Sequence, residues 1–448
     1  MFRPIVISIL FSLSATFNSL YAQDLLGIEG EEATTIGVYI KDIRTSEVLY
    51  DYNSDLALTP ASVMKAVTAA TALCKLGENF RFSTPVELRG SMQVGNVWRG
   101  DLVVRSCGDP TIESQHFKSN LGICDSISAA LRRLGIKKID GRLIVEQNMS
   151  DAGPVAQWEI EDVPWPYGAG LFGFNYRDNT AILYPLTGET KPFVPALDVS
   201  VVESKENNDL VRGVGSDRLT VYARNVKNRK WALEISVPDP AAVFLCRLHA
   251  VLKDRGIAVS NKKADAVSST VRSLYIHRSP AAKDILTSLM FRSDNLFAEG
   301  ILRALAPDDT RKNAVKCETQ LWGDRGLTSR CNLIFDGSGL SRGNRLQPRF
   351  LADVLEWMVN SPMADTYVSF FPRAGYDGTM KSFLAKSPLK GLIALKTGSM
   401  NAVQSYAGFK LDENGKPTHI IVIMVNGFFC SRAQLRRSIE QLLTDTFI

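Results

Sequence analysis

The chain is predicted to fold as a mixed α/β (α+β) domain, an antiparallel sheet flanked by helices, that is interrupted by a long β-rich insertion. Two observations predict this fold class. Strand-like and helix-like patterns alternate at both ends of the chain, whereas the middle is rich in short β-branched runs separated by Gly and Pro. The length of 448 residues also favours about three domains.

The first 22 residues form a segment of a different kind. Arg3 gives a positive start, Ile5 to Leu13 are apolar, and the segment ends on the small residue Ala22. This pattern is typical of a secretory signal peptide (residues 1–22), and the alternative is an uncleaved N-terminal anchor. The apolar run is short for a membrane span of ~20 residues. We therefore expect a secreted, periplasmic protein without a transmembrane span in the mature chain, and peripheral membrane contact stays open.

Residues 23–85 are predicted to form the first part of the α/β domain. Ile36 to Ile40 and Glu47 to Tyr52 have strand patterns and predict a hairpin. A helix then follows, because Thr59 is a favourable N-cap residue and Pro60 suits the first helical position. Apolar residues recur at helical spacing from Val63 to Leu73.

Residues 86–274 are predicted to be inserted domains, with an outer β-rich part at about 177–237. Two helices are expected here, at Ser126–Leu134 and Ala241–Lys253, each followed by a Gly. Residues 275–448 are predicted to complete the α/β domain. They begin with a helix-rich stretch, and then alternate between strand patterns and a final helix: Leu392–Lys396, Ser405–Leu411, His419–Val425 and Arg432–Leu443. Asn414-Gly415 predicts a hairpin turn.

Composition and charge exclude several classes of protein. The chain is 45% hydrophobic and 22% charged, as in ordinary globular proteins. Without Arg3, 51 basic and 47 acidic residues remain, a net charge of +4. This mild, scattered charge is typical of a solvated surface, so no nucleic-acid partner is expected.

The seven cysteines (74, 107, 124, 246, 317, 331 and 430) all follow the predicted signal peptide. Cys107 with Cys124, and Cys317 with Cys331, are close enough in sequence for local disulfides, although sequence alone leaves the connectivity open. No Cys-x-x-Cys pair occurs and only 4 His are present, so no metal site is expected.

Ser62-Val63-Met64-Lys65 is the first of three short motifs that predict chemistry. Ser-x-x-Lys occurs three times in the chain, but only Ser62 lies at the start of an apolar helix. There, Lys65 shares a helix face with Ser62 and can reach its hydroxyl. Burial and a nearby cation would lower the lysine pKa from about 10.4, so that the amine could act as a base. The alternative is an exposed lysine at an ordinary helix start.

The other two motifs are Ser293-Asp294-Asn295 and Lys396-Thr397-Gly398. The first could be only a polar turn and the second only the end of a strand. A functional reading makes Ser293 a proton relay, Asn295 a ligand of the substrate amide, and Lys396 a ligand of a substrate carboxylate. All three motifs occur in the order typical of serine β-lactamases and penicillin-binding proteins, which use a serine nucleophile with a lysine base.

The chain resembles the D-alanyl-D-alanine carboxypeptidase/endopeptidase family, the class C low-molecular-mass penicillin-binding proteins, through nearly all of its mature length. Beyond the three motifs, several stretches are similar to that family: Gly108-Asp109-Pro110, Phe174-Asn175, Asp336 to Ser341, Ala374-Gly375 and Asp377-Gly378-Thr379. Ser62 and Ser293 are 231 residues apart. This gap is several-fold longer than in class A β-lactamases and fits a family with domains inserted there. The odd number of cysteines has no counterpart in the family.

The resemblance implies a serine transpeptidase/β-lactamase-like fold and a set of residue roles. Ser62 would be the acylated nucleophile, Lys65 its base and Ser293 the relay. Asn295 would hold the substrate amide, and Lys396 and Thr397 its terminal carboxylate. The backbone amides of Ser62 and Ser399 would form the oxyanion hole.

The expected function is that of a serine D-Ala-D-Ala carboxypeptidase and DD-endopeptidase that hydrolyses peptidoglycan stem peptides through an acyl-enzyme and binds penicillin covalently. No metal or organic cofactor is expected. The expected partners are peptides ending in D-Ala-D-Ala, with β-lactams as covalent inhibitors. Two alternatives stay open: a serine β-lactamase, and a catalytically silent wall-binding protein.

Overall fold

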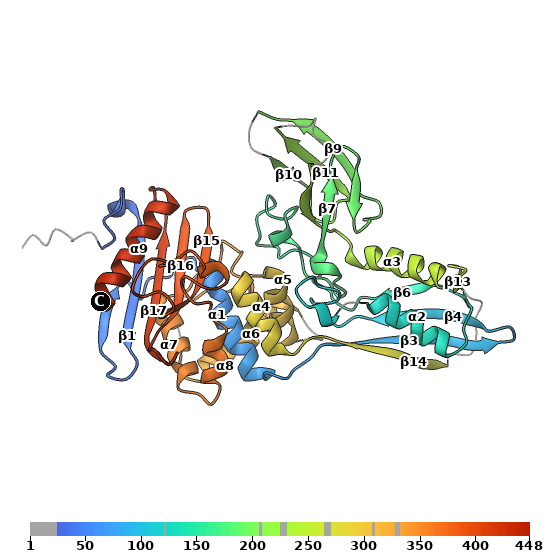
Figure 1. The fold of residues 1–448 in the computed structure, drawn as a ribbon, viewed down its shortest axis with the longest axis horizontal. Helices are drawn as coiled ribbons and strands as arrows, with labels where there is room; N and C mark the ends of the chain where they lie inside the picture. Colours follow the sequence, from blue (N-terminus) through green and yellow to red (C-terminus); the bar gives the residue numbers. More distant parts are fainter. Residues whose placement is uncertain are drawn as a thin grey trace, which may run out of the picture.

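The central element is a five-stranded antiparallel sheet built from both ends of the chain (Figure 1). The computed structural model describes residues 25–120, 122–205, 208–224, 231–263, 270–306, 310–327 and 332–448. The predicted signal peptide therefore lies outside the described residues. The strand order is β15 (Ile393–Met400), β16 (Val403–Leu411), β17 (Pro417–Asn426), β1 (Thr35–Asp42) and β2 (Val48–Tyr52), with every neighbouring pair antiparallel.

Helices cover both faces of this sheet, so its central strands are apolar on both sides. In β17, Val422 and Met424 join the core beneath the helices on one face, whereas Ile423 and Val425 pack towards α9 (Arg432–Phe447) on the other. The first face carries most of the helices: α1 (Met64–Lys75), α4 (Ala282–Arg292), α5 (Asn295–Ala304), α6 (Arg311–Gly323), α7 (Pro348–Val359) and α8 (Ala364–Ser369). The predicted fold class is confirmed.

The inserted region leaves and rejoins this domain through neighbouring strands. β3 (Ser83–Gln93) leads out, and β14 (Val271–Arg278) returns antiparallel to it, with Ser83 opposite Arg278. Their sheet is completed by β4 (Val97–Arg105), β5 (Lys138–Asp140), β6 (Leu143–Glu146) and β13 (Ala258–Val259). Side chains of α2 (Ile123–Arg133) and α3 (Pro240–Asp254) share one apolar core with this sheet.

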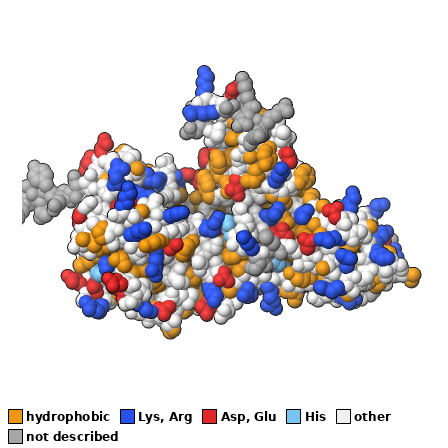
Figure 2. All heavy atoms as spheres, viewed as in Figure 1, with side chains coloured by type: hydrophobic (Ala, Val, Ile, Leu, Met, Phe, Trp, Pro, Cys, Tyr) orange, Lys and Arg blue, Asp and Glu red, His pale blue; other side chains and the backbone are white. Residues whose placement is uncertain are grey.

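Two small three-stranded sheets form an outer lobe, seen at the top of Figure 1. One contains β7 (Thr180–Tyr184), β8 (Glu189–Lys191) and β12 (Leu233–Ser236). The other contains β9 (Asp198–Glu203), β10 (Asp209–Val211) and β11 (Arg218–Ala223). In Figure 2, hydrophobic side chains gather on this lobe, whereas basic and acidic side chains intermingle elsewhere on the face shown. None of the helices among the described residues is long and apolar enough to cross a membrane.

Two local predictions were wrong. Thr59 does not cap the helix; its hydroxyl accepts a hydrogen bond from Arg345, and a short 3₁₀ helix, η2 (Ala61–Val63), precedes α1. Cys107 and Cys124 carry free thiols, because Cys124 is buried in α2 while Cys107 lies beside Thr84 at the base of the inserted sheet. Cys317 is also a free thiol, and its predicted partner Cys331 lies outside the described residues.

Candidate active site

Ser62 lies in η2, immediately before α1, with its side chain partly exposed. The turn is unusual because Ala61 has a left-handed backbone (φ 48°), which is unfavourable for a residue with a side chain. Gly339 leaves room for this turn, because a Cβ atom at Gly339 would collide with the carbonyl oxygen of Ala61. Strained backbone of this kind is typical of functional sites.

Lys65 is fully buried in the first turn of α1 and its amine has three partners. The Nζ atom lies 3.0 Å from Oγ of Ser62, 2.6 Å from Oδ1 of Asn295 and 2.6 Å from the carbonyl oxygen of Ser338. The last two atoms can only accept hydrogen bonds. A neutral amine has two hydrogens, so donation to these two acceptors leaves its lone pair directed at the Ser62 hydroxyl.

The lowered pKa of Lys65 favours the same neutral amine. Burial lowers the pKa of Lys65 to about 8, and the nearby carboxylates of Asp336, Asp294 and Glu299 oppose that shift. Lys396 is also fully buried; burial and the charge of Lys65 lower its pKa well below the ordinary value. Burial is therefore the main cause for both lysines, because a charged amine loses its hydration there.

The Ser293-Asp294-Asn295 motif forms the corner between two helices. Ser293 ends α4 with a left-handed backbone (φ 61°), and the Asp294 side chain caps α5 by accepting from the amide of Phe297 at 2.9 Å. Asn295 starts α5, where its Oδ1 faces Lys65 and its Nδ2 donates to the carbonyl of Tyr167 at 2.8 Å. The tight corner places Ser293 and Asn295 on the same side as the two lysines.

The Lys396-Thr397-Gly398 motif lies on β15, the edge strand of the main sheet. The amine of Lys396 donates to Oγ of Ser293 at 2.9 Å, and the hydroxyl of Thr397 donates to that of Thr379 at 2.9 Å. A Cβ atom at Gly398 would lie 2.9 Å from the amide nitrogen of Ser62. The glycine therefore lets the strand edge approach the Ser62 turn closely.

The structure brings the sequence-predicted residues together from both ends of the chain. Hydrogen bonds join Ser62, Lys65 and Asn295 in one group, and Ser293 and Lys396 in a second. Gly398 brings the strand of the second group against the Ser62 turn. Ser399 follows on the same strand, and its hydroxyl donates to Oε1 of Gln404 at 2.9 Å, so its side chain is held against the sheet.

The sequence analysis did not identify two residues that hold the Lys65 amine in place, Ser338 and Glu299. The carbonyl of Ser338 is a backbone group and has no signature of its own. Oε1 of Glu299 holds that peptide by accepting from the amides of Gly337 at 3.0 Å and Ser338 at 2.9 Å. The sequence could have indicated Glu299 as a site residue. It lies four residues after Asn295 and therefore on the same helix face.

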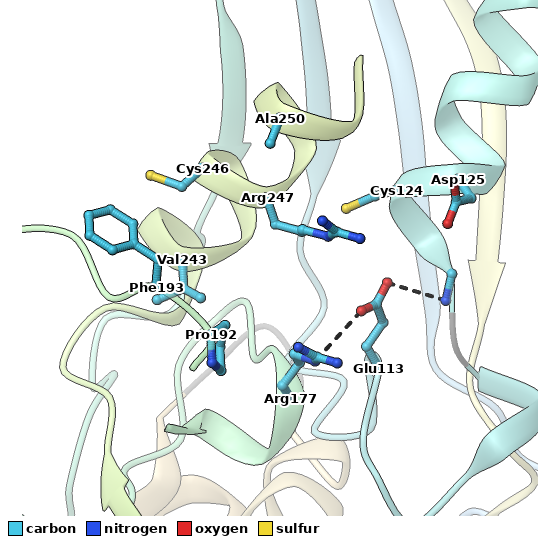
Figure 3. A pocket seen from close by; sticks show the side chains of 11 residues that line it. Glu113, Cys124, Asp125, Arg177, Pro192, Phe193, Val243, Cys246, Arg247 and Ala250 are labelled. Atoms are coloured by element: carbon cyan, nitrogen blue, oxygen red, sulfur yellow. Dashed lines mark hydrogen bonds and ion pairs between the residues drawn. The ribbon is translucent and has the colours of Figure 1, made fainter. Parts of the chain in front are cut away.

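A separate cavity of about 630 Å³ lies in the inserted region, between α2, α3 and the loop at Pro192 (Figure 3). None of the predicted site residues lines it. Glu113 in its wall accepts from the amide of Gly122 at 3.2 Å and lies 3.8 Å from Arg177. This cavity is therefore distinct from the lysine and serine cluster.

Comparisons with known proteins identify relatives over nearly the whole chain. Residues 22–445 match the D-Ala-D-Ala carboxypeptidase 3 (S13) family. The chain is 27% identical to the D-alanyl-D-alanine carboxypeptidase DacB of Haemophilus influenzae, over 94% of this chain and 91% of that protein. It is 26% identical to the D-alanyl-D-alanine carboxypeptidase of Actinomadura sp. strain R39, over 87% and 78% of the two chains.

The fold is similar to that of a solved structure, penicillin binding protein 4 (dacB) from Haemophilus influenzae. The TM-score is 0.77 at 25% identity, and the match covers 93% of this chain and 97% of that one. The family expected from the motifs is thereby confirmed: the chain belongs to the D-Ala-D-Ala carboxypeptidase 3 (S13) family and is a serine-type D-Ala-D-Ala carboxypeptidase.

Proposed function

We propose that Ser62 is the nucleophile of this carboxypeptidase and Lys65 its general base. The observation that carries the proposal is the set of three contacts at Lys65, two of which accept hydrogen bonds only. Proton transfer needs a base within hydrogen-bond reach of the hydroxyl and with a pKa near the working pH. Lys65 meets both requirements, at 3.0 Å and with a pKa of about 8.

We extend the proposal to the remaining site residues. Oγ of Ser62 attacks the carbonyl between two D-alanines, and its proton passes to Lys65 and then through Ser293 to the leaving amine. Asn295 holds the substrate amide. The departing D-alanine leaves an ester on Ser62, which water hydrolyses to release the shortened peptide.

Substrate recognition is assigned to β15. Lys396 and Thr397 bind the free carboxylate of a stem peptide ending in D-Ala-D-Ala, and the backbone amides of Ser62 and Ser399 form the oxyanion hole. Binding of an anion here restores the charge of Lys396, which burial otherwise disfavours. The same site accepts a cross-linked amine as leaving group, which gives endopeptidase activity, and β-lactams acylate Ser62.

The domain organisation and location are part of the proposal. Residues 23–85 and 275–448 form the catalytic domain, and 86–274 form the inserted domains. The pairing of β3 with β14 supports this division, because the inserted chain leaves and returns at adjacent positions. Residues 1–22 direct export, so the enzyme acts in the periplasm on peptidoglycan.

Covalent labelling by a fluorescent penicillin tests the assignment. Ser62→Ala is expected to abolish both labelling and release of D-alanine from a peptide ending in D-Ala-D-Ala. Ser260→Ala is the matched control, because Ser260 begins another Ser-x-x-Lys sequence in the inserted region. Intact labelling of the Ser62 variant would refute the proposal. Slow decay of the wild-type adduct, over minutes to hours, would separate the enzyme from a β-lactamase.

A further inference from the structure

A second cavity, of about 550 Å³, lies beside the part of β15 that precedes the Lys396-Thr397-Gly398 motif. Ligand sites usually have volumes of ~300–1,000 Å³. Its walls come from β15, α8, the end of α4 and the turn between β16 and β17. Ala394 in its wall lies two residues before Lys396, and Phe291 lies two residues before Ser293. The cavity therefore adjoins the elements that carry the active site, and we call it the strand-end cavity.

The order of residues on β15 indicates which end of the substrate the cavity faces. In the proposed complex the scissile carbonyl lies at the amide of Ser399, and the carboxylate of the departing residue lies at Thr397 and Lys396. The leaving side of the substrate is therefore directed towards the earlier residues of the strand. Ala394 lies three residues before Thr397, which is about 10 Å at a rise of ~3.3 Å per residue. The strand-end cavity is thus on the leaving side.

A short loop separates the cavity from the carboxylate-binding residues. Asp377 lines the cavity, whereas Thr379, two residues later, accepts a hydrogen bond from the Thr397 hydroxyl at 2.9 Å. Gly378 between them is exposed, and a Cβ atom there would lie 2.5 Å from the carbonyl oxygen of Phe291. The boundary is therefore thin. A ligand chain that continues from Thr397 to the cavity passes over a residue without a side chain.

The cavity has an apolar wall and a charged rim. Val368, Phe371 and Leu411 contribute to the wall, and Phe371 and Leu411 also belong to the core of the main domain. The fold therefore fixes the position of this wall. Arg373 and Asp377 lie at the rim and add a positive and a negative charge.

The charges of Arg373 and Asp377 are available to a ligand. Lys416 and Asp365, which also line the cavity, form an ion pair with each other at 2.7 Å. Arg373 is exposed, and neither Arg373 nor Asp377 takes part in an ion pair within the described chain. A guanidinium matches a carboxylate in charge and geometry, and a carboxylate accepts from backbone N–H groups. A peptide strand offers both kinds of group, together with aliphatic carbon for the apolar wall.

We propose that the strand-end cavity binds the leaving strand of a cross-linked peptide, with Arg373 holding a carboxylate of that strand. The inference rests on the proposed acyl transfer at Ser62. In carboxypeptidase and endopeptidase action alike, the amide at the D-Ala carbonyl breaks, the leaving amine gains a proton and water supplies the hydroxyl group. A single D-alanine ends at Lys396 and Thr397. A cross-linked amine carries a whole peptide, which continues into the cavity, so the cavity determines how well cross-links are cleaved.

The test compares two substrates: a linear peptide ending in D-Ala-D-Ala, and a dimer whose D-Ala carbonyl is joined to the side-chain amine of a second peptide. The measured quantities are kcat/KM for each substrate, from chromatography of the products, and the rate of penicillin acylation. Arg373→Ala is expected to lower kcat/KM for the dimer about tenfold, as for the loss of one charge-assisted hydrogen bond. Its values for the linear peptide and penicillin are expected to stay at the wild-type level, because neither reaches the cavity.

Three further variants make the result specific. Arg373→Lys keeps the charge and should retain part of the dimer activity. Ser369→Trp places a large side chain from α8 in the cavity, and should lower dimer cleavage without removing a charge. Arg437→Ala is the matched control, because Arg437 is exposed on α9, which covers the other face of the main sheet. It should behave like wild type on both substrates.

Unchanged dimer cleavage in Arg373→Ala and Ser369→Trp would overturn the inference. An equal loss on both substrates would do the same, since Arg373 would then support the active site itself. If one of these variants does not fold, the other decides. A wild-type enzyme that releases D-alanine from the linear peptide but leaves the dimer intact would refute the inference and leave the proposed function standing. Intact penicillin labelling of Ser62→Ala would instead refute the proposed function.

Discussion

At the scale of single residues, the burial and contacts of Lys65 favour the neutral amine that the proposed general base requires. Burial makes its charged form less favourable, and two obligate acceptors leave one direction for the lone pair. Ser62 lies in that direction at 3.0 Å. The two short-range features that a sequence can reveal, helix position and spacing, predicted the Ser62–Lys65 contact. The acceptor carbonyl of Ser338 comes from a distant loop and could not be predicted.

Penicillin acylation is expected to depend on pH through Lys65. With a pKa of about 8, the neutral fraction rises about tenfold per pH unit below pH 8 and levels off above it. Acylation should therefore speed up from pH 6 to 8 and reach a plateau. Lys65→Ala should lower the plateau by ~10²–10⁴-fold, measured by stopped-flow labelling. Lys263→Ala, in the control Ser260 sequence, should have no effect. Near-normal acylation of Lys65→Ala would remove it from the base role.

At the scale of elements, the site depends on how closely β15 meets η2. The strands and helices of the main domain were predictable because apolar periodicity and turn residues are local signals. The η2 turn was not, because the left-handed backbone of Ala61 follows from its contact with Gly339 in a distant loop. For the same reason Thr59 was taken for a helix cap, although it faces Arg345.

Gly398→Ala is expected to impair the site while leaving the fold intact. The added Cβ would lie 2.8 Å from the carbonyl oxygen of Pro60 and 2.9 Å from the amide of Ser62. The strand must then move away from the proposed oxyanion hole. Loss of one oxyanion donor costs about 10²–10³-fold in rate, and a fall of that order in acylation is expected. Gly213→Ala is the control, because its nearest neighbour would be 3.8 Å away. Equal rates in both variants would contradict this account.

At the scale of the whole molecule, the inserted region contributes directly to the support of Lys65. Nε1 of Trp158 donates to the Asp336 carboxylate at 2.8 Å, and the Tyr167 carbonyl accepts from Asn295 at 2.8 Å. Both residues belong to the predicted insertion. The change in sequence texture after Pro85 predicted an insertion beginning there. Its contacts with the site were not predictable, because they join residues more than a hundred positions apart.

Trp158→Phe tests this connection. The change keeps an aromatic ring at this buried position but removes a hydrogen bond to a buried carboxylate, which is worth ~1.5–3 kcal/mol. Unfolding by urea is expected to show a loss of about that size, together with slower acylation. Trp98→Phe is the matched control: Trp98 is 3% exposed, and its Nε1 has no hydrogen-bond partner in the described chain. If Trp98→Phe lowered the free energy of unfolding by as much, the effect of Trp158→Phe would come from lost packing and not from the lost hydrogen bond.

The pairing of β3 with β14 has a consequence for how the catalytic domain assembles. Once the insertion has folded, its two ends are held side by side, at Ser83 and Arg278. The entropy lost in closing a loop grows with the length of the flexible segment. A prefolded insertion therefore behaves, for the remaining chain, like a short connector, and α1 can find the C-terminal strands as readily as if they were near neighbours in sequence.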